Sequence, residues 1–128
     1  TLGFTEFQIE KTEWMKKLEF HLIHRAQNTL PLRLKYLARE FGFSYTSVKV
    51  KNMKTQWGSC SKDKRIHLNW RLVLAPRDVC DYVLLHELAH TKQMNHSDKF
   101  WHIVEKFSPH FKRHKAWLKA YGRELKVG

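Results

Sequence analysis

The spacing of apolar residues changes twice along this chain, and this change limits its fold more than any other feature. Apolar residues recur at helical spacing up to about residue 41, alternate with polar residues between 45 and 70, and return to helical spacing after 76. Helical spacing predicts helices, whereas alternation predicts strands. The chain is therefore expected to form helices, then strands, then helices, which is an α+β arrangement.

A length of 128 residues is enough for one compact core. We therefore predict a single domain over residues 1–128. Apolar residues make up 42% of the chain, which excludes disorder as its main state. No apolar run approaches the roughly 20 residues of a membrane helix, so we expect no membrane partner. The chain begins with Thr1 rather than methionine, which is compatible with a fragment of a longer protein.

Two helices are expected before the strands. The first covers about residues 11–26, with Thr12 as a candidate cap, and packs one face on the core. The second runs from Pro31 to Gly42, because proline suits a first helical turn and glycine suits a C-terminal cap. The apolar residues that support these helices are Trp14, Met15, Leu18, Leu22 and Ile23 for the first, and Leu34, Leu37 and Phe41 for the second.

The central region has the alternation of strands. Val48 and Val50 alternate with lysines, and Ile66 and Leu68 alternate with polar residues. A polar turn over 61–64 separates the strand that contains Trp57 from the strand that begins near Arg65. We predict a short antiparallel sheet.

Three helices are expected to follow the sheet. The first begins at Pro76 and continues to about Gln93, the second is capped by Ser97 and reaches Phe107, and the last begins at Pro109.

The first of these helices contains the strongest chemical motif, His86-Glu87-Leu88-Ala89-His90. Residues four apart lie on one helix face, so both imidazoles can reach one metal ion while Glu87 lies beside its water. This pattern is typical of a zinc hydrolase. Two solvated histidines and a surface glutamate are the alternative, but the surrounding helix is apolar, which disfavours it.

A catalytic zinc ion usually has three protein ligands. His96 follows His90 after a segment long enough to end the helix and turn back, so we expect His86, His90 and His96 to hold one Zn²⁺ ion. His102 and Glu105, on the next helix, are rival third ligands. The remaining histidines are expected at the surface or in packing contacts: His21, His24, His67, His110 and His114.

Such a site suits the hydrolysis of a peptide or protein substrate, with Glu87 as the general base. Trp57, Gly58 and Ser59 are candidate substrate-binding residues, because an edge strand can pair with an extended peptide. Trp57 as a core residue and Gly58 as a bulge are an equal alternative. Other candidates are Cys60 as a nucleophile, Asn69, Asn95 and Asp98 as acceptors for the imidazoles, and Arg71, His102 and Tyr121 as oxyanion donors.

The net charge of +12 raises nucleic acid as a possible partner. Residues 49–77 carry eight basic and one acidic side chain, residues 78–98 one and four, and residues 99–128 eight and two. A basic nucleic-acid-associated domain with a non-catalytic metal site is therefore the alternative function. The two cysteines, Cys60 and Cys80, form no disulfide framework, which favours a reducing, cytoplasmic location.

Several linked motifs resemble the YgjP-like zinc metallopeptidases over about residues 14–118. They are Gln56-Trp57-Gly58-Ser59-Cys60-Ser61, Ile66-His67-Leu68-Asn69-Trp70-Arg71-Leu72, Asp81-Tyr82-Val83, His86-Glu87-Leu88-Ala89-His90, Asn95-His96-Ser97 and Phe100-Trp101.

The resemblance implies a small zincin-like, gluzincin-like peptidase domain with metal on His86, His90 and His96 and with Glu87 as the catalytic acid/base. Members often have arginine where this chain has Gln56, and many have an N-terminal β-rich region that this sequence lacks. SprT-like proteases, which have a similar HExxH motif, act on proteins attached to DNA. By analogy, the basic segments 49–77 and 99–128 could serve such a role.

Overall fold

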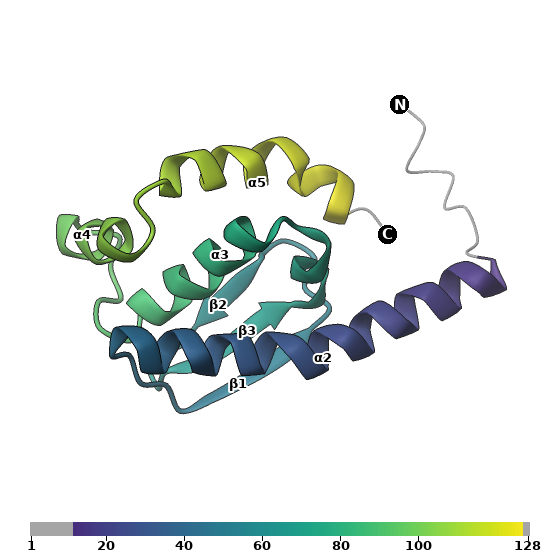
Figure 1. The fold of residues 1–128 in the computed structure, drawn as a ribbon, viewed down its shortest axis with the longest axis horizontal. Helices are drawn as coiled ribbons and strands as arrows, with labels where there is room; N and C mark the ends of the chain where they lie inside the picture. Colours follow the sequence, from purple (N-terminus) through teal and green to yellow (C-terminus); the bar gives the residue numbers. More distant parts are fainter. Residues whose placement is uncertain (1–11, 127–128) are drawn as a thin grey trace.

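The computed structural model describes residues 12–126, which form an α+β fold (Figure 1). In chain order the elements are α2 (Glu13–Phe41), β1 (Ser47–Lys51), β2 (Gly58–Cys60), β3 (Arg65–Asn69), the 3₁₀ helix η1 (Trp70–Leu74), α3 (Arg77–Ala89), α4 (Asp98–Phe107) and α5 (Phe111–Lys126). The predicted α+β class is confirmed. None of the helices in this described part is both long and apolar enough to span a bilayer.

Helix α2 corrects the prediction of two separate helices. It begins at its cap Thr12, whose side chain accepts a hydrogen bond from the Met15 amide, and ends at Gly42 with a left-handed φ of 76°. Pro31 lies inside this helix, although an interior proline removes one backbone hydrogen bond and costs about 3 kcal/mol. Leu30 and Leu34 flank it in the core, so burial of the continuous apolar stripe offsets this cost.

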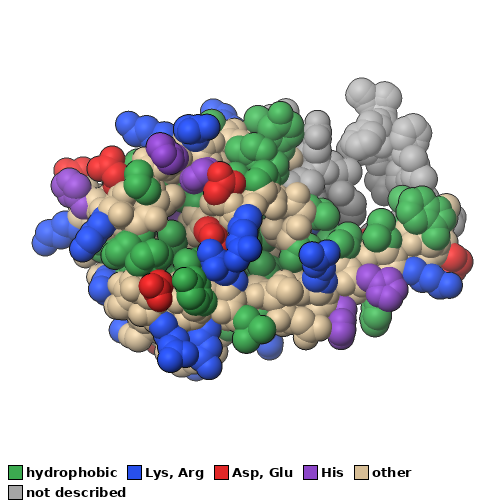
Figure 2. Space-filling view, viewed as in Figure 1, with side chains coloured by type: hydrophobic (Ala, Val, Ile, Leu, Met, Phe, Trp, Pro, Cys, Tyr) green, Lys and Arg blue, Asp and Glu red, His purple; other side chains and the backbone are tan. Residues whose placement is uncertain are grey.

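The N-terminal half of α2 does not pack as predicted. Trp14 is 65% exposed and Leu18 is 49% exposed, whereas Leu22 and Ile23 contact the core only in part. This half extends past the sheet in Figure 1, and hydrophobic side chains lie along it in Figure 2. Helical spacing therefore predicted the helix correctly, but it did not predict how much of the helix packs against the core.

The sheet has the strand order β1-β3-β2 and is mixed rather than antiparallel throughout. The pair β2–β3 is antiparallel, as predicted, but β1 and β3 run parallel. The difference arises because β2 lies at one edge, so the chain returns in β3 between the two earlier strands. Alternation shows which face of a strand is buried, but not which strand becomes its neighbour.

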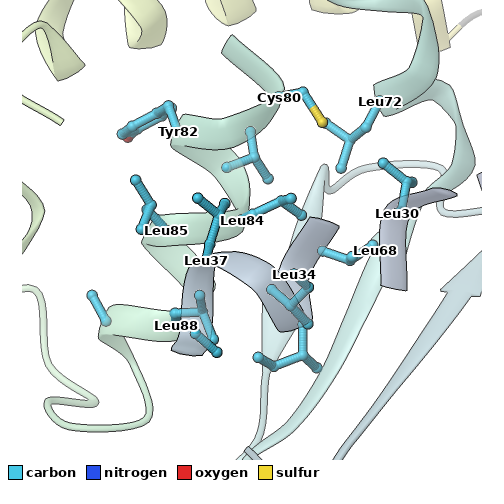
Figure 3. Close-up of a cluster of buried hydrophobic side chains, with 14 of the residues drawn as sticks. Leu30, Leu34, Leu37, Leu68, Leu72, Cys80, Tyr82, Leu84, Leu85 and Leu88 are labelled. Atoms are coloured by element: carbon cyan, nitrogen blue, oxygen red, sulfur yellow. The ribbon is translucent and has the colours of Figure 1, made fainter. Parts of the chain in front are cut away.

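The core lies between the sheet and helices α2 and α3. Leucines from α2, β3, η1 and α3 converge there, as Figure 3 shows for Leu34, Leu68, Leu72 and Leu84. Arg33 of α2 donates two hydrogen bonds to the Asp81 carboxylate of α3, at 2.9 and 2.7 Å, and so joins the two helices.

Helix α3 lies between the sheet and α5 (Figure 1). It ends at Ala89, four residues before the predicted end near Gln93, because the chain turns over residues 90–93. Helix α4 begins after Ser97, as expected, although the Ser97 side chain makes no capping hydrogen bond. Residues 86–96 therefore comprise the last residues of α3 and most of the loop that connects α3 to α4.

Candidate metal centre

His86, His90 and His96 lie together at the C-terminal end of α3. One ring nitrogen from each approaches the others so that all three lie within 4.8 Å of one another. His86 and His90 are one helical turn apart, and their ring centroids are 5.0 Å apart. His96 belongs to the segment between α3 and α4, and its ring centroid lies 4.8 Å from that of His90. The three imidazoles can therefore hold one metal ion.

The turn after α3 brings His96 back to the helix. The amides of Lys92 and Gln93 both donate to the Ala89 carbonyl, at 3.0 and 2.9 Å, which ends the helix and reverses the chain. Thr91 adds a side-chain hydrogen bond of 2.6 Å to the Leu88 carbonyl. The segment therefore reverses without a glycine.

Phe100 supports all three histidines from α4. It is fully buried, and its ring centroid lies 4.9 Å from His86, 4.4 Å from His90 and 5.0 Å from His96. Phe100 was not among the residues predicted from the sequence to form the site. Its position four residues after His96 was the available signal, because a helix that begins just after Ser97 returns residue 100 toward the loop.

The protonation states of His86 and His90 suit metal binding. Burial, together with smaller contributions from the neighbouring His90, His96 and Lys115, lowers the pKa of His86 to about 3. Burial also lowers the pKa of His90. At neutral pH both imidazoles are therefore uncharged and keep a lone pair for a cation.

Hydrogen bonds orient these two imidazoles. His90 Nδ1 lies 3.1 Å from the Gln93 carbonyl oxygen, and because a carbonyl only accepts, Nδ1 is the donor and Nε2 carries the lone pair. His86 Nδ1 lies 3.4 Å from the Tyr82 hydroxyl, one turn earlier on α3. Three imidazoles, two of them uncharged and oriented by hydrogen bonds, form a donor set that zinc prefers, so these residues fit a zinc ion.

Glu87 lies beside the histidines in an apolar environment. It is only 5% exposed, and burial raises the pKa of its carboxyl group to about 8. Gly58 of β2 packs directly on it: a Cβ atom at residue 58 would lie 3.1 Å from Glu87 Cγ, 3.2 Å from Glu87 Oε2 and 3.2 Å from the His67 carbonyl oxygen. Only a residue without a side chain lets β2 approach the carboxyl group so closely.

A cavity of about 230 Å³ adjoins Glu87 and His86. Its wall combines the loop before β2, the start of β2, α3 and α5, and the lining residues are Gln56, Trp57, Gly58, Tyr82, Val83, His86, Glu87 and Leu118. Trp57 lines this cavity and also packs against the core. The cavity is mainly apolar and opens beside a carboxyl group and an imidazole.

The rival third ligands lie elsewhere. His102 and Glu105 are exposed on α4 and do not belong to the histidine group. Ser59 pairs with His67 in the sheet and does not line the cavity. Cys60 faces the core side, where burial and then Glu87 raise the pKa of its thiol to about 11, so it stays protonated and is a poor nucleophile.

Two other predicted site residues stabilise the loop before β2 instead. The Asn69 side chain donates to the carbonyls of Met53 and Gln56, at 2.8 and 3.0 Å. Arg71 donates to the Asn52 side chain at 2.8 Å. Tyr121 is 47% exposed and packs on Trp117. The structure shows no hydrogen bond from Asn95 or Asp98 to an imidazole among the residues it describes.

Comparisons with known proteins agree with this geometry. A solved structure, the metallopeptidase zymogen of Pyrococcus abyssi abylysin, superposes with a TM-score of 0.61 at 27% sequence identity, and the match covers 68% of this chain and 89% of that chain. No curated protein sequence matches significantly. Residues 5–121 match the family described as YgjP-like, metallopeptidase domain. The chain therefore belongs to the YgjP-like metallopeptidases.

Proposed function

We propose that the protein is a zinc-dependent peptidase in which His86, His90 and His96 hold the ion and Glu87 is the general base. The observation that supports this most directly is the convergence of three ring nitrogens within 4.8 Å beside a buried carboxyl group. A zinc ion held there would supply a water of lowered pKa and polarise a substrate carbonyl group.

Glu87 performs the proton transfers in this mechanism. Its buried carboxyl group has a pKa raised to about 8 in the absence of a cation, and the positive charge of an ion beside it would lower that pKa. The carboxylate then accepts a proton at Oε2 or Oε1 as water attacks the peptide carbon. It returns that proton to the leaving amine.

Strand β2 supplies a main-chain edge for the substrate. The Trp57 carbonyl accepts from the Asn69 amide at 3.0 Å, and the Ser61 amide donates to the Arg65 carbonyl at 3.0 Å. Because an antiparallel ladder alternates, the main-chain groups of Gly58 and Cys60 then point away from β3. An extended peptide that pairs with them passes directly over Glu87, on which Gly58 packs.

The cavity beside Glu87 gives the substrate a side-chain preference. Trp57, Val83 and Leu118 make its wall apolar, and its volume of about 230 Å³ admits an aliphatic or aromatic side chain. We therefore propose that cleavage occurs beside an apolar residue.

The proposal is tested by comparing the wild type with Glu87→Gln in a peptide-library cleavage assay, with zinc content measured on both. The variant should keep stoichiometric zinc and lose about 10³-fold in kcat/KM, because only the proton acceptor is removed. The wild type should cleave next to apolar residues.

Glu105→Gln is the matched control, since it removes an exposed carboxylate from α4 outside the histidine group. Its activity and zinc content should equal those of the wild type. Full turnover by Glu87→Gln, or zinc binding that survives loss of all three histidines, contradicts the proposed site.

A further inference from the structure

The sheet has a second face that the proposed hydrolysis does not use. In the strand register, Val48 pairs with Ile66 and Ile66 with Cys60, and this row packs toward the helices. Because strand side chains alternate, the next row points to the opposite side. That row consists of Lys49, His67 and Ser59.

This opposite side is polar and positively charged. We call it the basic sheet face, and its residues are Ser47, Lys49, Lys51, Ser59, Arg65 and His67. Lys49, Lys51 and Arg65 are exposed, as are Lys54, Lys62 and Lys64 in the adjoining loops. From residue 47 to residue 65 the strands and their loops have six basic side chains and one acidic side chain, Asp63. By contrast, acidic and basic side chains are mixed on the face shown in Figure 2, which α2 crosses.

His67 lies at the centre of the basic sheet face. It is half-buried between β1 and β2, and burial lowers its pKa, with further contributions from the charges of Lys51 and Lys49. The imidazole is therefore uncharged at neutral pH and presents an aromatic ring among cationic side chains.

We propose that the basic sheet face binds single-stranded nucleic acid, with Lys49, Lys51 and Arg65 on the phosphates and His67 against a base. Lys49 and Lys51 are two residues apart on one strand, which separates their Cα atoms by roughly 6.6 Å along the sheet. Single-strand binding surfaces combine such a positive track with an aromatic ring on which a base stacks.

An anionic membrane fits this face less well. None of its six residues is apolar, so it offers nothing to insert below the lipid headgroups. A duplex also fits less well, because its stacked bases are not available to a ring at the centre of a short sheet.

The position of the face links it to the proposed function, on which this step rests. Within β2, Gly58 packs on Glu87 while Ser59 pairs with His67 on the basic sheet face. A nucleic-acid strand on that face would therefore lie across the sheet from Glu87, behind the β2 edge where we propose that a peptide is cleaved. Proteins associated with single-stranded nucleic acid are then the substrates that this arrangement favours.

Fluorescence anisotropy with labelled dT15 tests the binding, using the full chain at 50 to 200 mM salt. Three phosphate contacts predict a slope of log K against log salt of about −2, which is an affinity loss of about 20-fold over this range. Lys49→Ala/Lys51→Ala should weaken binding at least about tenfold and reduce the slope to about −1. His67→Ala should weaken binding about fivefold with an unchanged slope, because it removes stacking and no charge.

The matched control is Lys112→Ala/Lys119→Ala, which removes two exposed charges from α5 on the other side of α3. It should change affinity less than about twofold. An equal loss in this control, no binding to dT15, tighter binding to a duplex of the same length, or binding only to phosphatidylserine vesicles each overturns the proposal.

Basal peptide cleavage separates this inference from the proposed function. Lys49→Ala/Lys51→Ala should cleave short peptides as the wild type does, whereas Glu87→Gln should bind dT15 normally. Loss of dT15 binding in Glu87→Gln would show that nucleic-acid binding depends on the proposed catalytic site. It would overturn the assignment of this binding to the basic sheet face.

Discussion

At the scale of single residues, Gly58 sets the distance between strand β2, the proposed substrate-binding edge, and the carboxyl group of Glu87. Its missing side chain leaves room for Glu87 Cγ and Oε2 at 3.1 and 3.2 Å from the position of a Cβ atom, and for the His67 carbonyl oxygen at 3.2 Å. The backbone carbonyl cannot move without distorting β3. An added methyl group must therefore displace either β2 or the Glu87 side chain.

Gly58→Ala should lower kcat at least about tenfold while zinc content stays unchanged, because small displacements of a catalytic group are costly. Steady-state kinetics with metal analysis measures both effects. Gly42→Ala is the control: a left-handed φ of 76° with no atom within 4 Å predicts a stability loss of about 1 kcal/mol and an unchanged kcat. Equal kcat values for Gly58→Ala and the wild type would mean that the close approach of β2 to Glu87 does not matter for the reaction.

The buried carboxyl group of Glu87 also makes stability depend on pH when no metal is bound. Its folded-state pKa is raised from 4.5 to about 8. The contribution of the protonated carboxyl group to the free energy of unfolding is therefore fully present below pH 4.5 and is lost as the pH rises through 8. Metal-free wild type should therefore lose stability relative to Glu87→Gln between pH 6 and pH 8, by about 2 kcal/mol. Urea unfolding in the presence of a chelator measures this difference, and a difference that does not vary with pH would mean that the carboxyl group is solvated.

At the scale of elements, α2 shows how packing can override a local signal. Proline at position 31 predicts a helix start, yet the helix continues through it because Ala26, Leu30, Leu34 and Leu37 form one buried stripe. The sheet shows a similar effect, since alternation in β1 and β3 is the same for parallel and antiparallel neighbours. In both cases the contact between elements decides the outcome.

Pro31→Ala should stabilise the protein by about 1–3 kcal/mol, because the alanine amide restores the missing helical hydrogen bond. Urea unfolding measures the gain, and peptide cleavage should not change. Leu32→Ala is a neighbouring control whose side chain is 68% exposed, and it should change stability by less than about 0.5 kcal/mol. A destabilised Pro31→Ala would mean that the proline ring contributes more packing than the hydrogen bond.

At the scale of the whole molecule, the proposed metal centre draws its residues from two parts of the fold. His86 and His90 belong to α3, whereas His96 precedes α4, and Phe100 of α4 supports all three. An ion that binds these histidines binds only the folded chain. Metal binding should therefore stabilise the whole molecule.

Zinc at a thousand times its Kd should add about 4 kcal/mol to the free energy of unfolding, which calorimetry measures as a higher Tm. His96→Ala should lose most of this gain. His102→Ala, which changes an exposed histidine on the neighbouring helix, should keep it. If instead His102→Ala lost the zinc-dependent stabilisation and His96→Ala kept it, the third ligand would be His102 of α4.

The sequence by itself determined the types of most elements and the shared helix face of His86 and His90 with Glu87 beside it, because periodicity within one element is a local property. The chain spacing also pointed to His96. Only the tertiary structure decided the parallel pairing of β1 and β3, the continuity of α2, the approach of Gly58 to Glu87, the support from Phe100 and Tyr82, and the separation of Ser59 from the cavity. These features depend on contacts between elements far apart in the chain, and their free energies are set by burial and packing of the whole core rather than by any local run of residues.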